Sequence, residues 1–241
     1  MSIKIYIFGD SHTHCLKRAW KHNENKSLKE DVKIVTFSKI KNGTTIGDIT
    51  VEELISELHT LDESTYVVSC TGGNQHNVLS LIQHPIKFTQ ASLIDNLGSE
   101  VVIPEQAFRE LFLKGMANDM KRLSTIKDAV KQRINHVVAP PPKKDEAHIL
   151  KRHETDFTKK NIIGNGVTEP YLRLEIYKHQ VFATKTLCEH EEINIIDFPA
   201  EAKDKDGFLK ESYYAPDATH ANELFGKLLL DKIYAQITAG A

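Results

Sequence analysis

Short apolar runs, each rich in β-branched and aromatic residues, recur along the whole chain. Runs of four to six such residues bounded by glycine or polar residues are typical of β-strands. They occupy residues 3–8, 32–37, 66–70, 136–139 and 193–196. The pattern therefore predicts five strands, and the first of them is followed at once by a turn that begins at Gly9.

Between these runs, apolar residues recur at steps of three and four, which is the spacing of one face of a helix. The longest such stretch begins at Pro104, a residue suited to a first helical turn, and continues to Ile134. Further helices are predicted over residues 51–59, 171–187 and 221–237. Strands that alternate with helices predict an α/β protein with a parallel sheet covered on both faces.

The length of 241 residues suits one layered domain, so we expect a single domain over residues 1–241. Its most polar stretch is an insertion around residues 140–168, which opens with three prolines at 140–142. Prolines cannot continue a sheet, so the chain should leave the fourth strand there in an extended conformation. The insertion is either a solvated loop with a helical turn or a lid over the functional site.

Charge and composition narrow the function classes. With 31 basic and 33 acidic residues the net charge is -2, which gives no overall basic field for a nucleic-acid partner. No apolar run is long enough to span a membrane, and the start lacks the features of a secretion signal. Cys15, Cys70 and Cys188 are too scattered for a disulfide framework. We expect a cytoplasmic protein without a nucleic-acid or membrane partner; the sequence does not indicate its oligomeric state.

Polar residues and glycines gather where predicted strands end or where the last helix begins. In parallel α/β sheets these positions line the ligand cleft. Acyl-transfer chemistry needs a hydroxyl nucleophile, an imidazole base, a carboxylate that orients it, and donors for the developing oxyanion. The candidate segments are Gly9-Asp10-Ser11, Gly47-Asp48, Gly72-Gly73-Asn74 and Asp217-Ala218-Thr219-His220.

These segments can supply every role. Ser11 would be the nucleophile, His220 the base, and Asp217, three residues earlier, the carboxylate that holds the imidazole. The backbone N–H groups of Ser11 and Gly47 and the side-chain amide of Asn74 would form the oxyanion hole. This chemistry requires no metal or other cofactor. A second Asp-x-x-His pair, residues 145–148, lies in the charged insertion and is less well anchored.

In this order the four segments resemble the motif blocks of the SGNH, or GDSL-type, hydrolase superfamily. The resemblance covers the whole chain and implies a three-layer α/β/α, flavodoxin-like fold with a five-stranded parallel sheet. It also implies an acyl-serine ester hydrolase that removes a small O-acyl group, such as acetyl, from a carbohydrate or other polar metabolite. Two positions depart from the family pattern, where leucine and aspartate are usual: His12 and Gln75. Both are candidates for contact with the substrate.

Three alternatives remain. The same triad could serve an O-acyltransferase with an acyl-CoA donor, whose phosphates Lys143, Lys144, Lys151 and Arg152 could meet. A metallophosphoesterase could use Asp10 and His12, although it would need an acid at Val51 and a histidine at Gln75. A non-catalytic binding protein that retained the fold is the third.

Overall fold

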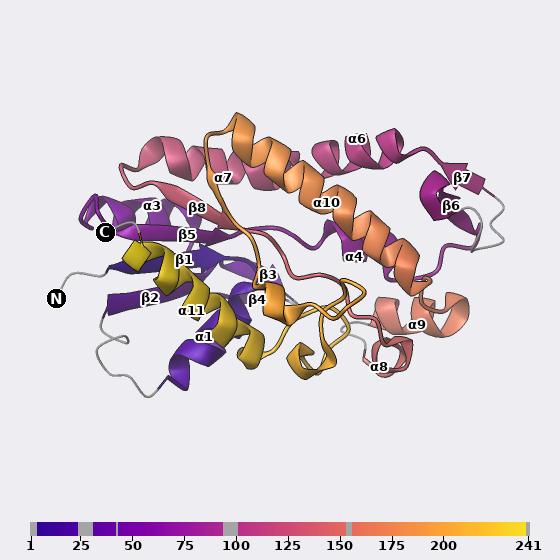
Figure 1. Ribbon diagram of the computed structural model, residues 1–241. Coiled ribbons are helices and arrows are strands. Elements are labelled where there is room, and N and C mark those ends of the chain that lie inside the picture. The colour runs from indigo at the N-terminus through magenta and orange to yellow at the C-terminus, as the bar shows by residue number, and fades with distance from the viewer. Residues whose placement is uncertain (1–3, 24–30, 42, 94–100, 153–155, 240–241) are drawn as a thin grey trace.

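The computed structural model describes residues 4–23, 31–41, 43–93, 101–152 and 156–239. Its centre is the predicted five-stranded parallel sheet (Figure 1). The strands lie in the order β2-β1-β5-β8-β9. Ile3, which the sequence pattern assigns to the first strand, lies outside the described residues. The strands are β1 (Ile5–Gly9), β2 (Val32–Thr36), β5 (Tyr66–Cys70), β8 (Ile134–Val137) and β9 (Asn194–Ile196).

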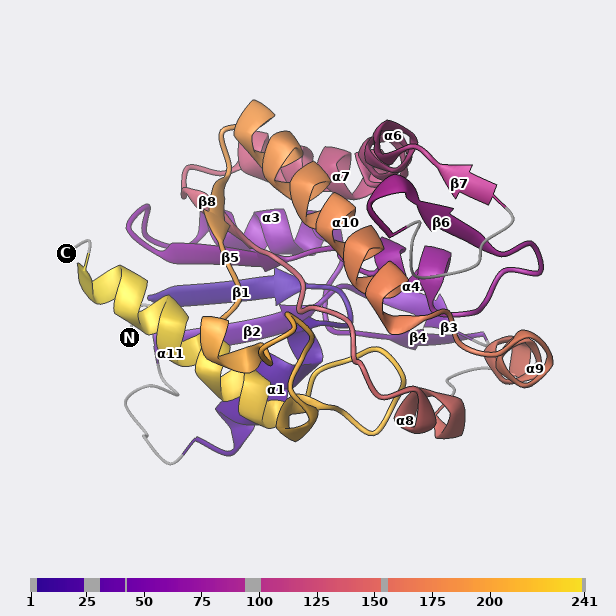
Figure 2. The ribbon, with the colours of Figure 1, turned by 45° about the vertical axis from the view of Figure 1, so that its right-hand side comes forward.

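Helices cover both faces of this sheet, which makes three layers (Figures 1 and 2). One face lies against α1 (Thr13–Lys21) and α11 (Glu223–Ala239), and the other against α3 (Val51–His59) and α7 (Ala117–Ala129). Side chains alternate across a strand. In β1, Ile5 and Ile7 therefore join the α1 and α11 side, whereas Tyr6 and Phe8 join the α3 and α7 side.

Several helices form as the sequence predicts. The helix α3 begins with a capping box, in which Thr50 accepts from the Glu53 N–H and the Glu53 carboxylate accepts from the Thr50 N–H. The long helix α10 (Pro170–His190) crosses the molecule and packs against α4 (Gln75–Ser80) and α6 (Glu105–Gly115) (Figure 2). Two short α-helices in the described ranges are α4 and α8 (Glu146–Lys151), of six residues each.

The predicted helix from Pro104 to Ile134 is in fact two helices and the start of a strand. The first, α6, ends at Gly115, and Met116 separates it from α7. Glycine is a poor helix former, and the two helices bury their apolar faces in different clusters, α6 against α10 and α7 against the sheet. Ile134 pairs with Val67 in β8, which consequently begins two residues earlier than predicted.

The polar insertion contains two helices, α8 and α9 (Asp156–Asn165), instead of a single helical turn. Its opening residues are buried: the three prolines and Lys143 all lie in the interior, whereas Lys151 and Arg152 are exposed. Residues 153–155 lie outside the described part of the chain. The insertion is thus anchored at its start and solvated further along.

Two small sheets were not predicted. The antiparallel hairpin of β3 (Lys39–Lys41) and β4 (Thr44–Ile46) is exposed along its length. The other pairs β6 (Phe88–Gln90) with β7 (Val101–Ile103) in parallel. Strands of three residues leave too short a run for a periodic signal. No helix in the described ranges is both long enough and apolar enough to cross a membrane.

The first and last helices, α1 and α11, lie side by side on one face of the sheet (Figure 1). Their contact depends on Gly226, because a Cβ atom there would overlap the Cys15 carbonyl oxygen. A side chain at position 226 would therefore push the helices apart. This close approach brings the segment before α1 and the segment before α11 to the same end of the sheet.

Candidate active site

One cavity of about 570 Å³ is lined by the three residues expected to form the triad, Ser11, Asp217 and His220. Ser11 follows β1 in the turn that leads into α1, at the carboxyl end of a central strand. Asp217 and His220 lie in the loop that leads into α11. Residues more than two hundred positions apart thus share one cavity wall, as the sequence analysis predicts.

Asp217 and His220 are in direct contact. A carboxylate oxygen of Asp217, Oδ2, lies 3.1 Å from Nδ1 of His220. The other oxygen, Oδ1, accepts hydrogen bonds from the backbone N–H groups of Thr219, at 2.9 Å, and His220, at 2.6 Å. Burial opposes ionisation of this carboxyl, but these contacts with His220 and Thr219 outweigh it and lower the pKa of Asp217. Asp217 is therefore a carboxylate at neutral pH, positioned to hold one ring nitrogen of His220.

Ser11 is partly exposed at the cavity wall. Its hydroxyl and the His220 ring are not hydrogen-bonded to each other in the described structure. Catalytic hydrogen bonds often tighten only when substrate is bound. The contact between hydroxyl and imidazole is one that a bound ester would have to complete.

The three expected oxyanion donors come from three loops. None of them, the Ser11 N–H, the Gly47 N–H or the Asn74 side-chain amide, donates a hydrogen bond to another described residue. Gly47 has φ +106°, and a Cβ there would overlap the Phe37 carbonyl oxygen, so this turn requires glycine. Gly47 and Asn74 do not line the Ser11 cavity, although Ile46 does.

The Asn74 amide is oriented by its neighbour in α4. The Asn77 side-chain N–H₂ group donates to the Asn74 Oδ1 atom at 3.0 Å. This bond fixes which end of the Asn74 amide is the acceptor, so its own N–H₂ group faces elsewhere. Asn77 was not predicted from the sequence, because a helical asparagine three residues from another belongs to no recognisable motif.

Asp10 links the Ser11 turn to the Gly72-Gly73-Asn74 segment. Its carboxylate accepts from the Gly72 N–H at 2.8 Å and from Arg122 at 2.6 Å. Arg122 also contacts Asp119, which accepts from the Gln75 side-chain amide at 2.6 Å. Gln75, predicted as a substrate contact, therefore takes part in a network that holds the two loops together.

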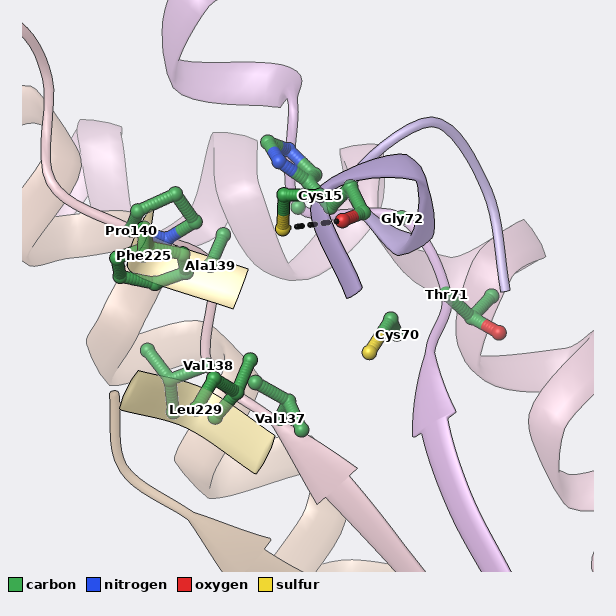
Figure 3. Close-up of a pocket in the computed structure, with 12 residues that line it drawn as sticks. Cys15, Cys70, Thr71, Gly72, Val137, Val138, Ala139, Pro140, Phe225 and Leu229 are labelled. Atoms are coloured by element: carbon green, nitrogen blue, oxygen red, sulfur yellow. Dashed lines mark hydrogen bonds between the residues drawn. The ribbon is translucent and has the colours of Figure 1, made fainter. Parts of the chain in front are cut away.

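His12 points toward a different cavity. It lines a small, mostly apolar cavity of about 20 Å³ between α1, α11 and the end of β8 (Figure 3). Its ring centroid lies 5.4 Å from that of His220, and its Nε2 atom has no hydrogen-bond partner among the described residues. Burial, together with the nearby His220 and His76, lowers the pKa of His12 to about 3, so the ring is neutral at pH 7. His12 does not line the Ser11 cavity.

A buried lysine that the sequence analysis interpreted differently supports the Asp217 loop. The amine of Lys143 donates to the backbone oxygens of Ala215, at 2.8 Å, and Asp217, at 2.5 Å. The Lys143 side chain has no exposed surface. The guanidinium of buried Arg173 in turn donates to the backbone oxygens of Lys143 and Lys144.

These contacts show that several charged residues of the insertion have roles other than those predicted from the sequence. Lys143 is inaccessible to a donor phosphate, and the amine of Lys144 is paired with Asp206 at 2.7 Å. In the competing Asp-x-x-His pair, Asp145 caps α8 by accepting from the His148 N–H. That pair therefore has a structural role, whereas Lys151 and Arg152 stay exposed beside Asp217.

Titratable side chains elsewhere in the described ranges form no cluster of three or more groups suited to a metal ion. The carboxylate of Asp10 is engaged by Arg122 and the Gly72 N–H. Cys15, Cys70 and Cys188 are free and buried, and burial raises the pKa of the Cys15 thiol to about 12.

No protein-family model matches the chain, and no curated protein matches its sequence. Solved structures match nearly all of it. A protein provisionally described as a platelet activating factor from Streptococcus pneumonia gives a TM-score of 0.50 at 12% identity, covering 98% of this chain and 85% of that chain. A carbohydrate acetylesterase family member from Sinorhizobium meliloti gives 0.48 at 12% identity, covering 98% and 99% of the two chains. A GDSL-like lipase from Bacteroides thetaiotaomicron gives 0.47 at 9% identity, covering 99% and 89%. The chain thus shares the fold of the first of these solved structures.

Proposed function

We propose that this protein is a serine-dependent ester hydrolase of the SGNH type, which removes a small O-acyl group such as acetyl from a carbohydrate or other polar metabolite. The observation that carries the proposal is the contact between Asp217 and His220 at 3.1 Å on the wall of the cavity that Ser11 also lines. The resemblance of the four motif segments to those of the superfamily supports the same assignment.

In the proposed reaction, His220 accepts the proton of the Ser11 hydroxyl as its oxygen attacks the ester carbonyl carbon. Asp217 holds Nδ1 of His220 and stabilises the imidazolium that forms. The carbonyl oxygen becomes an oxyanion that accepts from the N–H groups of Ser11 and Gly47 and from the Asn74 amide. His220 then protonates the leaving alcohol, and the acyl group stays on Ser11.

In the second half of the reaction water is the nucleophile and Ser11 is the leaving group. A water molecule attacks the acyl-serine carbonyl while His220 accepts its proton, and the acid leaves as Ser11 is restored. The alternative is an O-acyltransferase, in which acyl-CoA acylates Ser11 and a sugar hydroxyl replaces water. This alternative is supported by the exposed Lys151 and Arg152 beside Asp217, which could contact the phosphates of acyl-CoA.

A fluorophosphonate probe tests the proposed nucleophile directly. The protein is incubated with the probe and digested, and the labelled peptide is identified by mass spectrometry. Label on Ser11, absent in Ser11→Ala and prevented by heat denaturation, supports the proposal. Label confined to other serines, or none under conditions that label a known serine esterase, contradicts it.

The choice between hydrolysis and transfer needs a second measurement. Acetate release from O-acetylated sugars in water is compared with acetyl transfer from acetyl-CoA to the same sugars without acetyl groups. If the protein is a hydrolase, it should release acetate at a rate that added acceptor sugar does not lower. Transfer predicts an acetylated sugar whose formation depends on acetyl-CoA.

A further inference from the structure

Two neighbouring surface cavities are lined by many positively charged side chains, although the whole chain has a net charge of -2. Besides the triad, the Ser11 cavity is lined by cationic side chains from α1 and from the β3–β4 hairpin. A second cavity of about 450 Å³, lined by Lys151 and Arg152, shares Arg18 and Asp217 with the first. The cations of the two cavities are Lys17, Arg18, Lys21, Lys39, Lys41, Lys151 and Arg152.

Most of this charge forms no ion pair with an acid that the structure describes. Arg18, Lys39, Lys41, Lys151 and Arg152 each form no ion pair with an acid in the described part of the chain. Some cations elsewhere on the surface are paired, as Lys131 is with Glu63 at 2.7 Å and Lys185 is with Asp197 at 2.8 Å.

Among the residues that the structure describes, Asp217 is the only acid that lines these cavities, and its carboxylate already contacts His220 and Thr219. The effect on a neighbouring group is visible at His14, in the same cavity wall. Partial desolvation and the charges of Lys17, His220 and Arg18 lower the pKa of His14. A protein with a net charge of -2 thus concentrates unpaired positive charge around its candidate nucleophile.

Charge of one sign around a concave site attracts and retains a ligand of the opposite sign. Arginine adds directional binding, because its guanidinium matches the oxygens of a phosphate with two parallel hydrogen bonds. Arg18 lies where the two cavities meet, so an anion held there would leave the rest of the molecule within the Ser11 cavity.

We propose that the acyl carrier on which this site acts is phosphorylated, and that Arg18 and Arg152 bind its phosphate beside the Ser11–His220 centre. The proposal rests on the function proposed above and names its substrate class. The shared chemistry is a phosphate group, which either a phosphorylated alcohol or the coenzyme A of an acyl donor can provide. The concave shape favours a small molecule.

Two matched substrate pairs test the proposal and separate the two sources of phosphate. The acetyl ester of glycerol 3-phosphate is compared with the acetyl ester of glycerol, and acetyl-CoA with S-acetyl-N-acetylcysteamine, the same thioester without phosphates. We expect kcat/KM to be about tenfold or more higher for the phosphate-bearing member of one pair. That preference should weaken as ionic strength rises. Equal kcat/KM within both pairs overturns the proposal.

Charge-removing variants locate the phosphate. Arg18→Gln and Arg152→Gln should each reduce the preference for the phosphate-bearing substrate, mainly through a higher KM. The matched control is Lys131→Gln, which removes an exposed cation on another surface. The control should retain the preference of the unmodified protein. If Lys131→Gln lost as much of the preference for the phosphate-bearing substrate as Arg18→Gln, the effect would come from the overall charge. That result would contradict a phosphate site at Arg18 and Arg152.

A binding measurement separates this proposal from the proposed function. Glycerol 3-phosphate and glycerol are titrated calorimetrically into the unmodified protein and into Arg18→Gln. If the protein binds glycerol 3-phosphate more tightly than glycerol, and Arg18→Gln weakens this binding, the phosphate site is supported. If the same protein hydrolyses no ester, only the hydrolase assignment is refuted. Ester hydrolysis that depends on Ser11 but shows neither preference nor phosphate-dependent binding would refute the phosphate site alone.

Discussion

The Asp217 carboxylate holds His220 at two points: Oδ2 lies 3.1 Å from the ring Nδ1 atom and Oδ1 accepts the His220 backbone N–H at 2.6 Å. Ring and main chain are therefore fixed by one side chain three residues earlier. The spacing of the motif has a physical reason, since a tight turn brings residues i and i+3 together.

Replacing Asp217 by asparagine should reduce kcat for an aryl acetate by about 10³–10⁴-fold. The amide can still accept the backbone hydrogen bonds, but its N–H₂ group favours the His220 tautomer that carries its proton on the nitrogen facing Ser11. Steady-state kinetics together with a circular dichroism spectrum check the expectation. A folded variant that loses less than tenfold in kcat would show that Asp217 does not orient the base.

Replacing Ser11 by alanine should abolish ester hydrolysis above the background rate and leave the fold unchanged. The Ser11 hydroxyl makes no hydrogen bond to a described residue, so the free energy of unfolding should stay within about 0.5 kcal/mol of its original value. Denaturant titration and turnover of 4-nitrophenyl acetate measure the two quantities. Ester cleavage that persists at its original rate removes Ser11 from the role of nucleophile.

Replacing Asn74 by alanine should lower kcat by about 10²–10³-fold with little change in KM, because an oxyanion donor acts in the transition state. Asn77→Ala should have a smaller effect on kcat, since it only frees the Asn74 amide to rotate. The two variants and their combination are compared by kinetics. If Asn77→Ala alone lowers kcat as much as Asn74→Ala, or if only KM changes, the donor role is wrong.

Replacing Lys143 by methionine should destabilise the protein and slow the reaction. The backbone oxygens of Ala215 and Asp217 would lose a buried donor, at a cost of about 1–3 kcal/mol each. The matched control is Lys144→Met. The amine of Lys144 pairs with Asp206 near the surface, so its loss should lower the free energy of unfolding by at most about 1 kcal/mol. Denaturant titration and kcat of the folded protein are measured; equal effects of the two variants would contradict the support of the Asp217 loop by Lys143.

Lowering the pH should destabilise the protein already at pH values well above those at which its carboxyl groups are protonated. Burial, as the largest cause, lowers the pKa of His12 to about 3 and of His76 and His136 to about 4, so these rings stay neutral in the folded protein. Below pH ~6.5 the unfolded chain binds their protons and the folded chain does not, so the free energy of unfolding falls as pH decreases. Between pH ~6 and ~4.5 the decrease should reach up to about 4 kcal/mol per pH unit.

Urea titrations across this pH range measure that slope, and His136→Gln should reduce it by about a third. An unchanged slope in this variant would show that His136 is protonated in the folded protein or does not contribute.

Local patterns were sufficient for most of the architecture. Five strands and the helices α3, α10 and α11 follow from apolar runs, periodicity and turn residues. The strands are buried within the sheet, and the helices pack their apolar residues against the sheet or against neighbouring helices. The region from Pro104 to Ile134 did not follow, since its apolar spacing continues through Gly115 while the two halves pack against different clusters. Only the direction of burial distinguishes one long helix from two helices and a strand.

Sequence alone supplied the residue types of the candidate site and their order: a serine after the first strand, glycines and an asparagine after the third, and an Asp-x-x-His pair before the last helix. The tertiary structure decided what surrounds them. Lys143, expected at the surface, became an internal support, and Arg18 came to lie beside Lys151 and Arg152. A charged side chain looks the same in a sequence whether it is buried or exposed, because its environment depends on which distant segments fold against it.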